Sequence, residues 1–140
     1  MPPWLHELTM DHARLRALAS RLQPHRVETD QPPGAILLEL LLFLDQHSQR
    51  EEETLFRALS PILPTGRGPL AVARAEHAAL DAVGGRLRLA IGVRLDHPEY
   101  PVASRTVRHD LPRLLWLLER HLCAEETSLF PLAERLPAGS

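Results

Sequence analysis

Apolar residues recur at intervals of three and four in four segments of this chain, and no run alternates strictly between apolar and polar positions. Such intervals place side chains on one face of an α-helix. The pattern therefore predicts four helices, at about residues 3–21, 33–59, 70–91 and 104–135, and no sheet. Stretches rich in proline and glycine separate them at 23–33, 61–69 and 92–101. Helices joined in this way favour an all-α fold, an antiparallel up-down-up-down four-helix bundle.

The chain of 140 residues is expected to form one domain, residues 1–140, around a single buried core. Prolines bear on where two of the helices begin. Pro33 suits the first turn of the second helix, where its missing N–H has no partner in any case. Pro112 falls within the fourth predicted helix, so it indicates either a kink in the first turns or a later start.

Each predicted helix carries one histidine on its apolar face. His12 and His77 lie in the apolar stripes of the first and third helices. His47 and His121 lie in the second and fourth helices, and each is followed four residues later by a glutamate. Residues four apart lie one turn apart on the same side of a helix, so each imidazole and its carboxylate point the same way.

This arrangement of histidine and glutamate occurs twice in the sequence. The phrase His47-Ser-Gln-Arg-Glu51, followed by Leu-Phe at fixed offsets, recurs as His121-Leu-Cys-Ala-Glu125. Each copy is preceded by an acid-His-Ala-x-Leu unit, beginning at Asp11 and at Glu76. A duplication that keeps histidine and glutamate in register is hard to explain by packing alone.

Taken singly, these residues have ordinary explanations. A lone histidine on an apolar stripe is more often a hydrogen-bonded core residue, and a lone His-x-x-x-Glu pair arises easily by chance. Together, however, they would converge on one level of a bundle interior, where unpaired charge costs several kcal/mol. Divalent cations would remove that cost, and nitrogen and carboxylate ligands suit iron, manganese or zinc. The predicted metal ligands are His12, His47, Glu51, His77, His121 and Glu125.

Other acidic residues lie next to these candidates. Glu52, Glu53 and Glu126 are rotated by roughly 100° or more from the ligand line, so they are expected to face solvent or to pair with arginine. Asp11 and Glu76 each precede a candidate histidine, and they are expected to be peripheral unless they orient an imidazole from outside.

The remaining histidines and aromatic residues have simpler expected roles. Four histidines fall off the inward line or in loops and are expected at the surface: His6, His25, His97 and His109. The aromatic side chains are expected to form core or walls around the site: Trp4, Phe43, Phe56, Trp116 and Phe130. Cys123 is expected to pack rather than to perform redox chemistry.

Composition excludes several classes of function. The formal net charge is −2 and the acids are spread along the chain, so neither nucleic acid nor anionic lipid is an expected partner. No membrane span or secretion signal is expected, because the longest apolar stretch, 35–44, is interrupted by Glu39. The single cysteine excludes an intramolecular disulfide and a cysteine-based metal site. A cytoplasmic location is the default expectation.

The ordered set of motifs resembles the hemerythrin-like, or HHE cation-binding, domains over about residues 5–133. The resemblance implies an antiparallel four-helix bundle around a non-haem di-iron centre. It also implies that Glu51 and Glu125 are bridging carboxylates and that the four inward histidines are terminal ligands.

One position departs from the oxygen-carrying members of that family, which have a second histidine one turn before the ligand of the third helix. Here that position is Ala73, which leaves six protein ligands in place of seven and opens at least one coordination position. The resemblance then implies binding or sensing of O₂, NO or peroxide, or iron storage, in preference to simple reversible oxygen storage. A redox or signalling protein is the partner that such a function would need.

Two other hypotheses remain open. The same two metal ions could serve a small oxidoreductase of the peroxidase or ferroxidase type. Alternatively, the histidines and glutamates could pair only with one another in a metal-free structural bundle.

Overall fold

The computed structural model describes residues 1–23 and 33–140, and within them it contains helices and no strand. The first rod is α1 (Pro3–Ser20). The second runs without interruption through α2 (Pro33–Glu51), the π-helical segment η2 (Glu52–Phe56) and α3 (Arg57–Leu59). The third is α4 (Pro69–Ile91), and the fourth joins α5 (Tyr100–Ala124), the π-helical segment η3 (Glu125–Leu129) and α6 (Phe130–Glu134).

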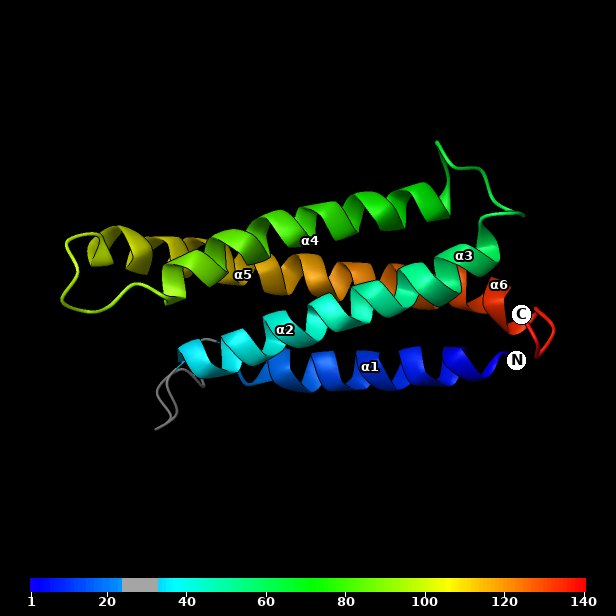
Figure 1. The fold of residues 1–140 in the computed structure, drawn as a ribbon, viewed down its shortest axis with the longest axis horizontal. Helices are drawn as coiled ribbons and strands as arrows, with labels where there is room; N and C mark the ends of the chain where they lie inside the picture. Colours follow the sequence, from blue (N-terminus) through cyan, green and yellow to red (C-terminus); the bar gives the residue numbers. More distant parts are fainter. Residues whose placement is uncertain (24–32) are drawn as a thin grey trace.

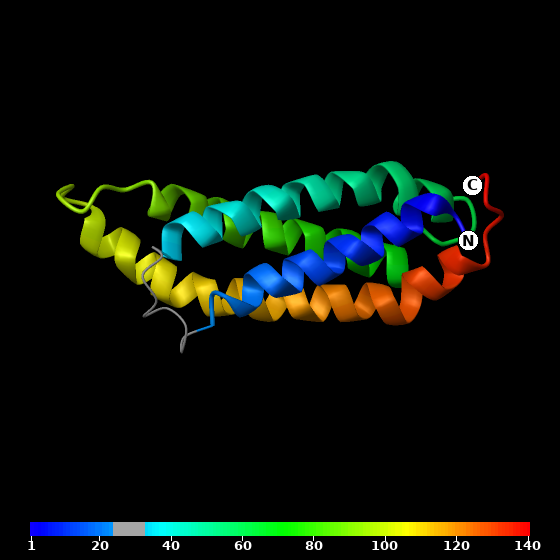
Figure 2. The same ribbon diagram turned by 90° about the horizontal axis from the view of Figure 1, so that it is seen from below.

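The four rods form an antiparallel bundle in which the chain runs up, down, up and down (Figure 1). Both termini lie at the same end, beside α3 and α6. In the second view α1 lies between α2 and α5, with α4 behind (Figure 2). The predicted all-α four-helix bundle is therefore confirmed. Every helix within residues 1–23 and 33–140 is too short or too polar to cross a bilayer.

The observed helices begin and end close to their predicted limits, with one difference. The fourth rod begins at Tyr100 rather than near residue 104, with Pro101 in its first turn. Pro112 lies inside α5 and does not mark its start. The proline removes one backbone donor from the interior of this helix. Most of the predicted loop 23–33 lies outside the described residues.

Two apolar clusters fill the interior. The first lies toward the end of the bundle that holds the loop between α4 and α5. Its buried members are Leu15, Leu18, Leu22, Ile36, Leu37, Leu40, Leu41, Leu44, Leu80, Val83, Leu87, Leu114, Leu118 and Leu122. The second lies toward the termini. Its buried members are Leu5, Leu8, Leu55, Phe56, Leu59, Leu70, Ala73, Leu129, Phe130 and Ala133.

A polar layer separates the two clusters, and the sequence of every rod shows why. In α1, Leu8 belongs to the second cluster, Leu15 to the first, and His12 lies between them. In the three other rods, the candidate ligands likewise follow residues of one cluster and precede residues of the other. Burying each large apolar side chain contributes about 1.5–3 kcal/mol. The two clusters therefore fix the register of the rods and bring the polar residues to a common depth.

Two adjacent glycines in α4 allow a test of how the packing limits stability. A Cβ atom at Gly85 would meet nothing within 4 Å, whereas one at Gly84 would lie 3.2 Å from Cδ2 of Leu41. Glycine inside a helix costs about 0.5–1 kcal/mol relative to alanine. Gly85→Ala should therefore raise the free energy of unfolding by about that amount in urea denaturation, and Gly84→Ala should gain less. A lower stability for Gly85→Ala would contradict this packing.

Candidate metal centre

The structure brings the six predicted ligands together in the polar layer. One imidazole comes from each rod, and the two carboxylates come from the second and fourth rods. All six are buried: His12 is 1% exposed, His47 0%, Glu51 0%, His77 7%, His121 0% and Glu125 1%. Such a density of ionisable groups in an apolar interior requires compensation of charge.

The Nε2 atoms of all four imidazoles face the two glutamates. Oε1 of Glu51 lies 2.9 Å from Nε2 of His47, 3.2 Å from that of His77 and 3.8 Å from that of His121. Glu125 faces His12, with Oε1 at 3.1 Å from Nε2, and His121, with Oε2 at 3.4 Å. Each carboxylate therefore lies close to one of the pair His12 and His47 and also to at least one of the pair His77 and His121.

The ligand atoms form two overlapping groups, each with its atoms within 4.8 Å of one another. One group comprises His12, His47, Glu51 and Glu125. In the other, His77 and His121 replace the first two histidines and both glutamates are retained. Two cations could therefore be held side by side with two carboxylates in common.

The outer nitrogen of three imidazoles is held by a carboxylate. Nδ1 of His47 donates to Asp11 Oδ2 at 2.9 Å, and Nδ1 of His121 donates to Glu76 Oε1 at 2.9 Å. These two acids were expected to be peripheral unless they oriented an imidazole, and the structure shows that they do. A proton fixed on Nδ1 leaves Nε2 as a lone-pair donor toward the interior.

Glu126 is the functional residue that the sequence analysis missed. It pairs with Arg16, as expected, through contacts of 2.6 and 2.8 Å. It also accepts a hydrogen bond from Nδ1 of His12 at 2.8 Å, which was not expected. Glu126 is rotated away from the ligand line of its own helix, but that rotation directs it toward α1. The only sequence signal was its position directly after Glu125.

The two π-helical segments begin at or directly after the glutamates. A π turn closes over five residues rather than four, which brings residue i+5 above residue i. Phe56 and Phe130, each five residues after its glutamate, are buried at 0% and 6% exposure. The Phe56 ring lies 5.0 Å from that of His77, and the Phe130 ring lies 4.8 Å from that of His12. The predicted role of these two phenylalanines as walls of the site is confirmed.

Three other aromatic residues do not line the centre. Trp116 is 59% exposed beneath the Arg120 guanidinium, so its predicted place in the core or in the wall is wrong. It lies on the outer face of α5, opposite Leu114 and Leu118. Phe43 is half-buried against the first apolar cluster, and Trp4 is half-buried against the second.

The predicted packing role of Cys123 is also wrong. Its thiol is exposed and donates to Glu119 Oε1 at 3.2 Å. Glu52 and Glu53 are exposed, as predicted. Three of the predicted surface histidines, His6, His97 and His109, are exposed, whereas His25 lies outside the described residues.

Four buried atoms of the six residues bear on whether these residues fit a metal. Within residues 1–23 and 33–140 these atoms have no hydrogen-bond partner: Nε2 of His47, Oε2 of Glu51, Nε2 of His121 and Oε2 of Glu125. The 2.9 Å approach of His47 Nε2 to Glu51 is close, but it does not have the alignment of a hydrogen bond. Unpartnered buried nitrogen and oxygen atoms facing one another are the expected environment of a cation. The donor set therefore fits a metal.

The ionisation of the metal-free site supports this fit. Burial alone lowers the pKa of His47, but its hydrogen bond to Asp11 and the nearby carboxylates of Glu125 and Glu51 outweigh burial and raise the pKa to about 11. Burial also lowers the pKa of His121, and contacts with Glu51, Glu125 and Glu76 raise it to about 9. Burial raises the pKa of Glu51, but hydrogen bonds from its neighbours hold it well below its usual value. Without a cation, protons on the imidazoles balance the glutamates, and a cation would displace them.

Together, the fold and the site define a four-helix bundle with a buried histidine and glutamate centre. The family described as the hemerythrin HHE cation binding domain matches residues 5–133. The chain belongs to this family. No curated protein and no solved structure matches it.

A pH dependence follows from the two raised histidine pKa values. A histidine whose pKa is raised by folding stabilises the protein fully below its unfolded pKa of about 6.5 and loses this effect as pH rises through the folded pKa. The urea midpoint of metal-free protein should therefore fall from about pH 6.5 through about 9, the pKa of His121, and continue to fall toward about 11, the pKa of His47.

Metal-loaded protein should not show this fall, because metal binding requires neutral imidazoles and strengthens as pH rises. Urea denaturation of both forms at pH 6.5, 8 and 9 checks the difference. A metal-free form that gains stability over this range would contradict the ionisation described above.

Proposed function

We propose that this chain is a non-haem di-iron protein that binds a small ligand such as O₂, NO or peroxide at its metal centre. Glu51 and Glu125 would bridge two cations. His12 and His47 would complete one position, and His77 and His121 the other. The observation that carries this proposal is the pair of overlapping ligand groups that share both glutamates.

The donor set suits iron. It provides four imidazole nitrogens and two carboxylates, without a thiolate, and inward-facing histidines and glutamates of helix bundles hold pairs of iron or manganese ions. The Cys123 thiol is exposed at the surface, where it donates a hydrogen bond to Glu119, so it is not a candidate ligand of the buried centre. Manganese and zinc also accept these donors, and metal analysis distinguishes them.

Ala73 supports binding of an added ligand. It lies one turn before His77, is only 3% exposed and supplies no donor atom. A pocket of about 250 Å³ lies between α4 and η3, lined by Ala73, Glu76, Glu125 and Leu129 among others. A small molecule could therefore approach the ion held by His77 and His121 from this pocket, through the space where a further histidine in place of Ala73 would lie.

The residues around the centre have defined roles in this proposal. Asp11, Glu76 and Glu126 accept hydrogen bonds from Nδ1 of three imidazoles and so hold them in the tautomer whose Nε2 lone pair faces the centre. Phe56 and Phe130 exclude water from the faces of His77 and His12. Ferrous ions at the site would supply the electrons for binding or reducing the ligand.

Substitution of a ligand tests the metal assignment. His121→Ala or Glu125→Ala should each remove at least one iron per chain, measured by elemental analysis after anaerobic loading. Each should also lower the urea midpoint of loaded protein, because metal binding and folding are coupled. His97→Ala is the control, because His97 is exposed in the loop before α5 and should change neither quantity. An unchanged iron content in both ligand variants would refute the assignment.

The visible spectrum of ferrous-loaded protein separates ligand binding from turnover. Exposure to O₂, NO or peroxide should produce a stable charge-transfer band for a binding or sensing protein. Continuous consumption of peroxide without a stable band would support a small oxidoreductase instead. Loaded protein that responds to none of these molecules would contradict the proposed ligand class and favour iron storage.

A further inference from the structure

The four imidazoles differ in the residues that accept a hydrogen bond from Nδ1, the nitrogen that faces away from the centre. The first side of the centre is the one formed by His12 and His47. There, His47 donates from Nδ1 to Asp11, and Arg50 donates to both oxygens of that carboxylate at 3.0 Å. A two-pronged contact between arginine and carboxylate is the strong form of this interaction. The ring of His47 is therefore tied to a carboxylate that is itself held in place.

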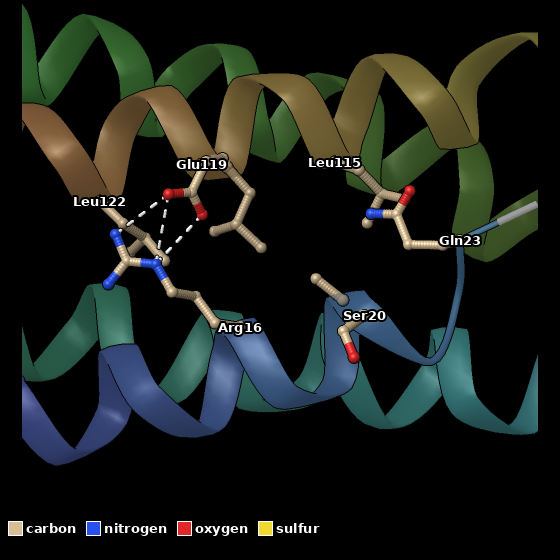
Figure 3. A pocket seen from close by; sticks show the side chains of 8 residues that line it. Arg16, Ser20, Gln23, Leu115, Glu119 and Leu122 are labelled. Carbon is tan, nitrogen blue, oxygen red and sulfur yellow. Dashed lines mark hydrogen bonds and ion pairs between the residues drawn. The ribbon is translucent and has the colours of Figure 1, made fainter.

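His12, on the same side, is tied in the same manner. Its Nδ1 donates to Glu126, and both terminal nitrogens of Arg16 contact that carboxylate at 2.6 and 2.8 Å. Arg16 also pairs with Glu119 across the gap between α1 and α5, at one end of a pocket of about 230 Å³ (Figure 3). Both histidines of the first position are thus backed by a carboxylate and an arginine.

The second side is held less firmly. His121 donates from Nδ1 to Glu76 at 2.9 Å, and within residues 1–23 and 33–140 no arginine pairs with Glu76. His77 has no hydrogen-bond partner for Nδ1 in the part of the chain that the structure describes, and it rests on the Phe56 ring. At 7% exposed, His77 is also the most accessible of the six candidate ligands.

The pocket over Ala73 lies on this weaker side. It runs between α4 and η3, with Glu76 and Glu125 among its lining residues. On the first side, the pocket between α1 and α5 is bordered by the Arg16–Glu119 pair (Figure 3). Solvent and small chelators therefore have a space next to Glu76, the carboxylate that holds His121, and next to the shared ligand Glu125.

We infer that the two cation positions differ in exchange rate: the ion held by His12 and His47 is retained, whereas the ion held by His77 and His121 exchanges with solution. An ion leaves as its ligands rotate away one after another, and a ring tied at its outer nitrogen resists that rotation. His77 is free of such a tie. This inference rests on the proposed function, because it requires two bound cations.

Release of iron to a chelator measures the difference. Protein loaded anaerobically with two ferrous ions is mixed with an excess of a chromogenic ferrous chelator, and absorbance is followed in time. Two phases of equal amplitude are expected. Their rates should differ at least about ten-fold, because losing a residue that orients a metal ligand typically weakens metal binding by at least that factor.

Carboxamide variants assign each phase to a position. Glu126→Gln should accelerate the slow phase about ten-fold or more and leave the fast phase unchanged. Glu76→Gln should accelerate only the fast phase. Glu119→Gln is the matched control, because Glu119 lies on the same rod and accepts from the same Arg16, and in the described part of the chain it contacts no imidazole. It should change neither phase.

Each outcome supports or refutes the inferred difference in exchange rate. Release of both ions in a single phase would overturn the inference and leave the proposed function standing, whereas protein that binds no iron would overturn both. Equal effects of Glu126→Gln and Glu119→Gln would show that Glu126 does not position His12. Circular dichroism and the urea midpoint of each metal-free variant verify folding, and Asp11→Asn tests the slow phase if Glu126→Gln does not fold.

Discussion

Compensation of buried charge is the constraint on which this bundle depends. Four imidazoles and two carboxylates lie at one depth, each less than a tenth exposed, between two apolar clusters. Transfer of such groups from water costs several kcal/mol per unpaired charge. In the metal-free protein, protonated histidines offset part of this cost. The raised pKa values of His47 and His121 reflect this pairing of protonated imidazoles with carboxylates. Cations between the Nε2 atoms would offset it more completely and would couple metal binding to the stability of the fold.

The backbone and the outer side chains both serve this layer. The π turns after Glu51 and at Glu125 turn a leucine and a phenylalanine inward together, so that the layer is closed on the side of the termini. π turns inside helices occur often at functional sites. On the outside, three carboxylates fix imidazole orientation, and arginines hold two of the three. The resulting asymmetry arises from these outer contacts, because the inner ligands of the two positions are alike in type.

Much of this architecture could be predicted from the sequence, because helical spacing determines direction around one rod. The inward course of His12, His47, His77 and His121 followed from their place in apolar stripes, and the register of the two clusters then brought them to one level. Contacts that depend on a neighbouring rod were harder to predict. Glu126 turns away from its own ligand line and for that reason meets α1, and Trp116 faces outward although it is large and apolar.

The π turns were missed for a related physical reason. The Leu-Phe pairs after each glutamate were visible as a repeat, but adjacent residues lie about 100° apart on a regular α-helix, and pairs such as Leu40 and Leu41 are both buried there without a π turn. The apolar pattern therefore carries no signal that distinguishes a π turn from a regular helix. The fourth rod also begins earlier than expected, at Tyr100, and its first turns run past the end of α1 and the start of α2 (Figures 1 and 2).

The most direct measurement of the central claim is anomalous X-ray diffraction from crystals of the iron-loaded protein, recorded on both sides of the iron absorption edge. The account predicts two peaks in the polar layer, one near Nε2 of His12 and His47 and one near Nε2 of His77 and His121, with Glu51 and Glu125 between them. A layer without an iron peak, or iron bound only at surface residues, would contradict it.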